Sequence, residues 1–173
     1  SLDSAQKRGA KVLAELVGYG SSSDAYRVTD MHSEGRGGAQ AMQAALADAG
    51  LTPEAIDYIN THGTSTHEND SIETLAIKSV FKERAKQVPA SSVKSMLGHL
   101  IGAAGAAELI TCVLAIRDNI VPPTINLNDP DPNLDLDYVP NAPRPMPVNV
   151  VMNESFGFGG QNNVVIVKRY EAT

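Results

Sequence analysis

The sequence predicts an α/β fold in which helices cover both faces of a sheet. Segments with strand-like alternation and segments with helical spacing follow one another along the chain, as they do in α/β domains. The 173 residues are about one domain's worth and can bury a hydrophobic core. Hydrophobic residues make up 42% and charged residues 20% of the chain, as in globular proteins. Because no repeat or internal linker interrupts it, residues 1–173 are predicted to form one domain.

The first third of the chain is expected to form a helix, a strand, a loop and a second helix. Residues 1–9 have a polar start and a glycine stop, which is typical of a helix. Residues 11–20 alternate as a strand does, and the serines that follow begin a polar loop towards Arg36. A row of apolar residues at helical spacing predicts a helix over residues 38–49, which Gly50 ends. The members of this row are Ala41, Ala45, Leu46 and Ala49.

Two short strands flank an amphipathic helix in the middle of the chain. Thr52 and Pro53 are expected to start a short helix, with Thr52 as its cap. Residues 56–61 then form a compact strand, and residues 88–93 form a second, brief one. The helix between them is expected to carry one apolar face. That face consists of Ile72, Leu75, Ala76, Val80 and Phe81.

The last part of the chain combines a buried helix, a long loop and a hairpin. Residues 102–118 are apolar on nearly every side, which predicts a helix buried on all faces. Most prolines lie in residues 128–147, which predicts a surface loop with one extended piece at residues 136–139. Residues 148–152 and 164–168 are expected to pair as strands around a glycine-rich turn.

Charge and composition exclude several classes of function. The net charge of −6 argues against non-specific nucleic-acid binding, which needs a basic excess. The single cysteine, Cys112, excludes an intrachain disulfide. The longest apolar stretch is too short to span a bilayer, and residues 1–8 contain no apolar signal core. We therefore expect a cytoplasmic protein with no nucleic-acid or membrane partner.

The first candidate site is the segment Asn-Thr-His-Gly-Thr-Ser-Thr at residues 60–66. It places His62 on a glycine turn at the carboxyl end of a predicted strand, where α/β folds hold reactive groups. The hydroxyls beside it, including Thr64 and Thr66, could bind a polar ligand chain. Alone, the segment fits equally well a loop histidine followed by hydroxyls that cap the next helix.

The second candidate site is Lys-Ser-Met-Leu-Gly-His at residues 94–99, followed by small residues and then Glu108. A lysine and a histidine at the start of a buried helix need partners, because burying an unpaired charge is costly. Glu108 is the available counter-ion for Lys94. A salt-bridged helix start beside a satisfied core histidine explains the same residues, so this alternative stays open.

The third candidate site is Phe-Gly-Phe-Gly-Gly at residues 156–160. Its glycines would let backbone amides approach a ligand closely, as an oxyanion site requires. By itself the segment fits a glycine-rich hairpin turn better.

Taken together, these three strings resemble those of elongating β-ketoacyl-acyl-carrier-protein synthases of the KAS II type. Their order and approximate spacing match, and so do flanking residues such as Tyr58-Ile59-Asn60 and residues 122–127. The resemblance covers nearly the whole chain. It implies a thiolase-type fold of two similar halves, each with a mixed five-stranded sheet between helices, and this chain resembles the second half.

The resemblance also implies what the chain lacks. Residues 1–10 correspond to the helix that joins the halves, and the family's nucleophilic cysteine lies in the missing first half. Cys112 matches no catalytic position and is expected to be a buried structural thiol. The isolated chain is therefore expected to be inactive.

The family implies roles in a decarboxylative Claisen condensation for the matching residues. His62 and His99 resemble the pair that donates hydrogen bonds to the enolate. Lys94 resembles the lysine that organises the second histidine, His99, and Glu108 completes the buried charge network. The amide of Phe158 resembles half of the oxyanion hole, and its ring resembles the gate of the acyl tunnel. Two further groups of residues are expected to bind substrate. They are the phosphopantetheine-binding hydroxyls of Thr64 and Thr66 and the neighbouring Phe156, Gly157 and Gly159.

The implied partners are the N-terminal half, an acyl carrier protein with its phosphopantetheine arm, and a second copy of the complete enzyme. Neither a cofactor nor a metal is expected. Where the family usually has a proline, this chain has His67, which is expected to be only a loop residue. A non-catalytic partner subunit, like the chain-length-determining relatives, is an alternative, although it would have no need of both histidines. A thiolase-like enzyme acting on coenzyme A thioesters is a third option, but its usual motifs differ.

Overall fold

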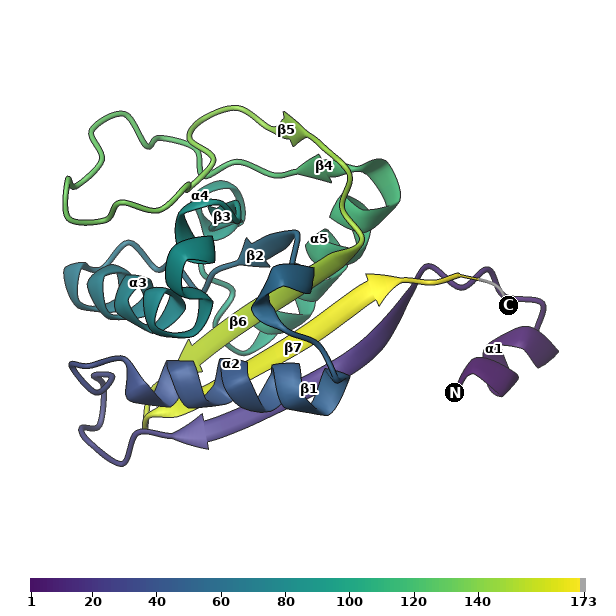
Figure 1. Ribbon diagram of the computed structural model, residues 1–173, viewed down its shortest axis with the longest axis horizontal. Helices are drawn as coiled ribbons and strands as arrows, with labels where there is room; N and C mark the ends of the chain where they lie inside the picture. The colour runs from purple at the N-terminus through teal and green to yellow at the C-terminus, as the bar shows by residue number, and fades with distance from the viewer. Residues whose placement is uncertain (172–173) are drawn as a thin grey trace.

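A mixed five-stranded sheet is the centre of the computed structural model, which describes residues 1–171 (Figure 1). The strand order is β1-β7-β6-β2-β3, in which β1, β7 and β6 pair antiparallel while β6, β2 and β3 pair parallel. The strands are β1 (Ala14–Ser23), β2 (Tyr58–Asn60), β3 (Ala90–Ser91), β6 (Val150–Gly157) and β7 (Gln161–Arg169). This arrangement confirms the predicted fold class. The last two positions of the predicted 1–173 domain lie outside the described residues.

Helices cover both faces of this sheet and divide the core in two. Helices α2 (Arg36–Ala49) and α3 (His67–Phe81) lie on one face, and α5 (Ala104–Asp118) lies on the other (Figure 1). Each face has its own cluster of buried apolar side chains. Helix α1 (Leu2–Lys7) buries no residue and lies apart from the sheet. The remaining elements are η1 (Pro53–Ala55), η2 (Lys82–Lys86), α4 (Lys94–Leu97), η3 (Ile101–Ala103), β4 (Ile120–Val121) and β5 (Arg144–Pro145).

A glycine in β1 lets α2 pack directly on the strand. A Cβ atom at Gly20 would lie 2.0 Å from the carbonyl oxygen of Ala41 and 2.5 Å from the amide nitrogen of Ala45. Strand glycines often mark such a close approach of two backbones. The alanine row predicted for this helix faces the strand, with Ala41 and Ala45 fully buried.

The prediction for residues 21–23 was wrong, because β1 continues through these serines. Ser21, Ser22 and Ser23 pair in register with β7, so the backbone ladder holds them extended despite their polar side chains. The hydroxyl of Ser22 also donates to the carbonyl oxygen of Gly37 at 2.6 Å.

The helix α3 forms where predicted, but its buried stripe is rotated from the predicted one. Leu75 is half exposed, whereas Ile77 is fully buried. The stripe includes Glu73, Ala76, Ile77 and Val80, which follow the i, i+3, i+4, i+7 spacing of one helix face. A glutamate therefore lies in register with the apolar core.

Helix α5 is buried along one stripe rather than on all faces. Ala104, Glu108, Cys112, Ala115 and Ile116 are buried, while Ile110 is 62% exposed. The prediction took the apolar character of the helix as a sign of burial on every side. Within residues 1–171, however, no element covers the exposed apolar residues of α5.

The proline-rich segment contains more pairing than expected. Strand β5 lies within residues 128–147 and pairs with β4, which was not predicted. The extended piece at residues 136–139 contacts β3's edge through a parallel bridge between Asp137 and Pro89. Thr52 precedes η1 as predicted, but its side chain makes no capping hydrogen bond. Within residues 1–171, none of the helices is long and apolar enough to cross a membrane.

Candidate active site

His62 lies directly beyond the carboxyl end of β2, in the loop that leads to α3. Its side chain is buried, and its ring centroid lies 5.7 Å from that of Phe156 on β6. The loop is held rigidly at Gly63, where φ is +41° and a Cβ atom would lie 2.5 Å from the Cβ atom of Ser92. The hydroxyl of Ser92 donates to the carbonyl oxygen of Gly63 at 2.7 Å. The segment after β2 therefore presents His62 in one fixed position.

The buried carboxylate of Glu73 on α3 accepts hydrogen bonds from the backbone of the same loop. Oε1 accepts the backbone N–H of His62 at 2.7 Å, and Oε2 accepts the backbone N–H of Gly63 at 2.9 Å. The side-chain amide of Asn69 donates to Oε2 at 3.2 Å. Glu73 comes from α3, so this contact joins the helix to the histidine loop.

Lys94 and Glu108 form a buried ion pair beside His62. Lys94 begins α4 and Glu108 lies on α5, and both side chains are almost completely buried. The Lys94 ammonium donates to Oε1 of Glu108, and its Nζ atom also lies 3.4 Å from Nδ1 of His62. The pairing with Glu108 expected from the sequence is present, so the lysine charge is compensated. Lys94 contacts His62, however, and not His99, the histidine that it was expected to organise.

The surroundings of His62 keep its imidazole neutral. Burial lowers the pKa of His62 to about 3, and the positive charge of Lys94 and the neighbouring His99 act in the same direction. A histidine with so low a pKa carries no proton on its second nitrogen at neutral pH.

His99 lies next to His62 and is exposed at the surface of the described chain. The two ring centroids are 5.6 Å apart and the ring planes are nearly perpendicular, at 85°. Nδ1 of His99 accepts the backbone N–H of Ile101 at 3.1 Å. Ile101 has a φ of +52°, a left-handed conformation that is rare for a β-branched residue. The segment before α5 thus turns one backbone N–H back onto the imidazole.

A cavity of about 350 Å³ adjoins His99 and the loop that carries His62. Lys94, His99 and Thr64 line one part of it, and Ile77, Leu134 and Tyr138 line another. The second part is closed over by the proline-rich segment, which the Tyr138 hydroxyl ties to Thr74 at 2.5 Å. A mixed polar and apolar lining of this kind suits a small organic ligand.

The two threonines predicted to bind substrate behave differently. Thr64 lines the cavity. Thr66 is exposed, and its hydroxyl accepts the backbone N–H of Asn69 at 3.3 Å, so it caps α3. The helix-capping alternative therefore describes Thr66. Their Oγ1 atoms lie 3.3 Å apart. His67 is the exposed first residue of α3, so it is helical rather than a loop residue.

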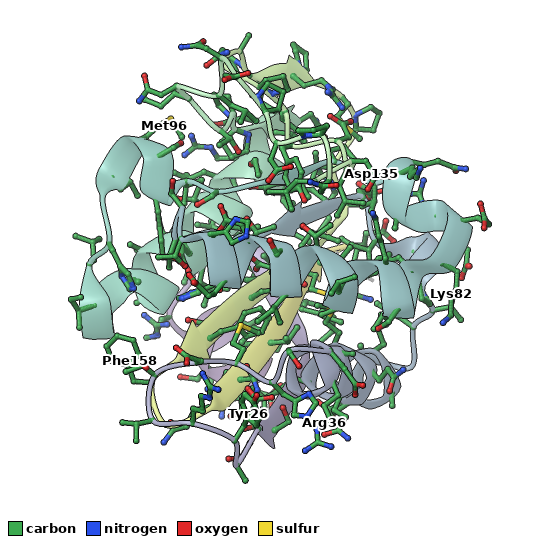
Figure 2. All side chains as sticks on the ribbon, turned by 90° about the vertical axis from the view of Figure 1, so that its left-hand side faces the viewer. Tyr26, Arg36, Lys82, Met96, Asp135 and Phe158 are labelled. Atoms are coloured by element: carbon green, nitrogen blue, oxygen red, sulfur yellow. The ribbon has the colours of Figure 1, made fainter. Side chains whose placement is uncertain are left out.

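The residues 156–160 divide between the core and the surface. Phe156 is buried against His62, and Gly157 ends β6. The Phe158 ring is 79% exposed and lies at the periphery of the molecule (Figure 2). The amide of Gly159 donates to the carbonyl oxygen of Val28 at 2.7 Å. The structure thus gathers His62, His99, Lys94, Glu108 and Phe156 in one place, and none of the described aromatic contacts joins Phe158 to either histidine.

Within residues 1–171, neither the cysteine nor a cluster of metal-binding side chains offers a second reactive centre. Burial and the nearby Glu108 carboxylate raise the pKa of the Cys112 thiol, so it remains protonated and inert as a nucleophile. Within residues 1–171, no group of three or more His, Cys, Asp or Glu side chains is arranged to hold a metal ion.

Sequence reasoning missed the residues that support the histidine loop. Ser92 was expected only as part of a strand, and Glu73 was not singled out. The available signal was the position of Glu73, three, four and seven residues before buried members of α3. A glutamate on an apolar stripe indicates a buried carboxylate that needs donors.

Comparison with known proteins places this site in a family. Residues 13–128 match the model of the beta-ketoacyl synthase C-terminal domain. The chain is 51% identical over 168 residues to a 3-oxoacyl-[acyl-carrier-protein] synthase 2 of Coxiella burnetii, covering 97% of this chain and 41% of that protein. The chain therefore spans well under half the length of such relatives.

Solved structures share the fold closely. One similar structure is a type II PKS acyl-carrier protein in complex with its ketosynthase. It matches with a TM-score of 0.95 and 41% identity, over 99% of this chain and 42% of the matched chain. The ishigamide ketosynthase/chain length factor matches with a TM-score of 0.94 and 44% identity, over 99% of this chain and 41% of that one.

Proposed function

The chain belongs to the β-ketoacyl synthase family, as its C-terminal domain, and from this we propose that it carries the enolate-stabilising half of a decarboxylative condensing enzyme. The observation that supports this function best is the pair of neighbouring imidazoles, each of which has its Nδ1 atom occupied. Such a pair can offer two Nε2–H donors to one developing negative charge.

At His99 the hydrogen bond from Ile101 assigns the tautomer. A backbone N–H can only donate, so Nδ1 of His99 must accept, at a distance of 3.1 Å. The proton of the neutral ring is then on Nε2. Because His99 is exposed in the described chain, this N–H is free to meet a substrate.

At His62 the charge of Lys94 has the same effect. An ammonium group has donors and no acceptor, and the Lys94 ammonium is paired with the Glu108 carboxylate. Nδ1 of His62, 3.4 Å from Nζ, is therefore the acceptor, and Nε2 carries the proton. The low pKa of His62, near 3, keeps the ring neutral and so preserves this donor arrangement.

The two donors would act on the oxygen of a malonyl thioester. The bond between the α-carbon and the carboxylate breaks, CO₂ leaves, and the electron pair moves onto the thioester oxygen as an enolate. Two N–H groups stabilise this charge more in the transition state than in the ground state. The α-carbon then attacks the carbonyl carbon of an acyl thioester on a cysteine, and the cysteine thiolate leaves as the β-ketoacyl product forms.

The remaining predicted residues would bind and orient the substrate. Thr64 lines the cavity beside His99, which supports contact with a phosphopantetheine arm. Thr66 would reach such an arm only through the hydroxyl that also caps α3. We propose that the Phe158 amide completes an oxyanion hole and that its exposed ring meets the acyl tunnel once the N-terminal portion is present. The glycines on either side would leave room for this approach.

The proposed partners follow from the length and composition of the chain. It covers about 41% of the Coxiella relative, so we infer that an N-terminal portion supplies the nucleophilic cysteine. The acyl carrier protein would deliver the malonyl group, as supported by a neighbour whose structure contains such a protein with its ketosynthase. We further propose that the complete enzyme forms a homodimer.

A chain-length-factor-like role is the alternative, since the ishigamide ketosynthase/chain length factor is among the similar structures. A non-catalytic subunit does not need two imidazoles with their donors fixed by Ile101 and Lys94. The geometry of the pair therefore favours the catalytic role.

Reconstitution separates these possibilities. The 173-residue chain alone should form no β-ketoacyl product from acyl- and malonyl-carrier protein, because its only cysteine, Cys112, is buried and protonated. Joined to the N-terminal portion, it should form product and release CO₂. Steady product formation by the chain alone would contradict the proposal. An assembled protein that neither acylates a cysteine nor decarboxylates malonyl groups would favour the chain-length-factor role.

A further inference from the structure

Glu154 is a carboxyl group that is buried behind the candidate site, where no hydrogen-bond donor of the described residues reaches it. It lies on β6 between Met152 and Phe156, and all three side chains point to the same face of the sheet because strand residues alternate. Met152 and Phe156 belong to the core cluster that α2 and α3 cover. Glu154 is 0% exposed, and neither of its carboxyl oxygens receives an N–H or O–H donor from the described residues.

The group that meets Glu154 from the helix side is Glu73. The two carboxyl groups lie within hydrogen-bonding reach of each other. The described ion pairs do not reach either of them, since the nearby Lys94 is committed to Glu108. Two carboxylates side by side in a buried site cannot both be ionised, so the pair must hold at least one proton.

The hydrogen bonds decide which carboxyl group holds that proton. Glu73 accepts the backbone N–H of His62 on one oxygen and that of Gly63 on the other, which favours its charged form. Glu154 receives no such donors. We propose that Glu154 is a protonated positioning residue, which donates its proton to Glu73 and thereby keeps both oxygens of Glu73 as acceptors for the loop that carries His62.

The titration behaviour of the two groups agrees with this assignment. Burial raises the pKa of Glu154 well above its usual range, and the charge of Glu73 raises it further. Burial also raises the pKa of Glu73, but the N–H donors of Gly63 and His62 act against this. The other titratable groups facing the pair are Asp70 on α3 and Tyr138 on the segment over the cavity. Neither supplies a positive charge.

The first test measures stability against pH without any substrate. In the unfolded chain Glu154 ionises at ordinary pH, whereas in the folded protein it stays protonated. The folded state therefore binds more protons, and this residue makes stability fall as the pH rises above the unfolded pKa. Glu154→Gln keeps a donor and has no proton to lose. In the complete enzyme, its Tm should exceed that of the wild type at pH 8, and the difference should shrink towards pH 5.

Two control variants test whether Glu73 is the partner of Glu154 in this measurement. Glu73→Gln should lower the Tm at every pH, because the His62 and Gly63 N–H groups lose a charged acceptor. On the Glu73→Gln background, adding Glu154→Gln should still raise the Tm at pH 8, because burial is the main cause of the raised pKa of Glu154. The gain should be smaller than in the wild type, since the charge of Glu73 is gone. Parallel Tm curves for the wild type and Glu154→Gln between pH 5 and pH 8 would overturn the assignment of the proton.

The second test addresses positioning and rests on the proposed function. Malonyl decarboxylation and acylation of the cysteine are measured separately in the complete enzyme. Glu154→Gln should keep decarboxylation within about twofold of the wild type, whereas Glu154→Leu, which cannot donate, should lose about tenfold or more with acylation retained. Full decarboxylation by a folded Glu154→Leu variant would refute the positioning role. If the Glu154→Leu variant does not fold, the Glu154→Gln variant decides. A loss of decarboxylation in Glu154→Gln as large as that in Glu73→Gln would refute the positioning role, because glutamine still provides a donor.

The two tests separate the two proposals. If the wild-type enzyme never decarboxylates malonyl groups while the pH-dependent Tm difference is present, the proposed function is wrong and the shared proton stands. If decarboxylation is present and the Tm curves are parallel, the function stands and the role of Glu154 is wrong.

Discussion

At the scale of single residues, two different donors occupy the same ring nitrogen of the two histidines. A buried ammonium, Lys94, serves His62, and a backbone N–H, that of Ile101, serves His99. In the proposed function, both contacts leave the Nε2–H group of the ring available to the substrate, so both rings would act as donors although different groups occupy their Nδ1 atoms. Each should therefore contribute to the same chemical step.

Replacing either histidine by alanine should abolish malonyl decarboxylation in the complete enzyme and leave acyl transfer to the cysteine largely intact. Losing one such donor costs on the order of 3 kcal/mol, or roughly a hundredfold in rate. Release of labelled CO₂ and mass spectrometry of the acylated cysteine measure the two steps. Wild-type decarboxylation in His62→Ala or His99→Ala would remove that residue from the mechanism.

The left-handed backbone at Ile101 should be what fixes the His99 tautomer. Ile101→Gly takes a φ of +52° more easily and keeps the N–H, so the Nε2–H tautomer should persist. Ile101→Pro has no N–H and a φ fixed near −65°, so Nδ1 loses its donor. Solid-state NMR of protein labelled with ¹⁵N at histidine distinguishes the two tautomers directly. An unchanged His99 spectrum in a folded Ile101→Pro variant would contradict this explanation.

Residue types alone indicated only that Glu108 could pair with Lys94, because a buried lysine needs a counter-ion. The resemblance of three short strings to a known family then predicted His62, His99, Lys94 and Glu108 as one group. The helical spacing of apolar residues around Glu73 could indicate its burial but not its partners, and Glu154 was out of reach of the same reasoning. Their partners are backbone N–H groups and each other, and nothing in the local sequence specifies those contacts. They depend on α3 and β6 meeting, which only the fold determines.

At the scale of elements, periodicity predicted the existence and order of the main helices and strands. It placed Ala76, Val80 and Phe81 correctly on the buried face of α3 but included the half-exposed Leu75. It left out Glu73, because a pattern of apolar residues does not register a buried carboxylate. It ended β1 too early, because the pairing of Ser21 to Ser23 with β7 comes from the ladder and not from side-chain hydrophobicity. In each case a tertiary contact overrode the local pattern.

The contact between α2 and β1 depends on the absence of a side chain at Gly20. Gly20→Ala should destabilise the fold strongly, because its Cβ atom would lie 2.0 Å from the Ala41 carbonyl oxygen and would push the helix off the strand. Overpacking of this kind costs about 1–3 kcal/mol. Gly102→Ala is the matched control, since nothing lies within 4 Å of its added Cβ atom. Equal denaturation midpoints for the two variants would show that α2 does not approach β1 so closely.

At the scale of the whole molecule, one side of the chain remains uncovered. Strand β1 and helix α5 present apolar side chains there, and Leu16 and Ile110 are each 62% exposed. These two residues lie with others around one shallow hollow. The other members are Leu13, Ala14, Glu15, Leu109, Val113, Leu114 and Val167. Helix α1, with no buried residue of its own, also has no partner among residues 1–171.

This surface should make the chain self-associate or bind a hydrophobic dye when it is alone. Clustered exposed apolar residues of this kind usually mark an interface, and the chain spans about 41% of the Coxiella relative, so an N-terminal portion is the expected cover. The double variant Leu16→Arg with Ile110→Arg should reduce dye binding and shift sedimentation towards a monomer. The same variant should fail to assemble with the N-terminal portion, whereas a matched substitution on α3, across the sheet from α5, Leu75→Arg, should assemble normally. A dye-silent, stable monomer of the unaltered chain at low micromolar concentration would show that α5 needs no cover, and the two-half architecture would be wrong.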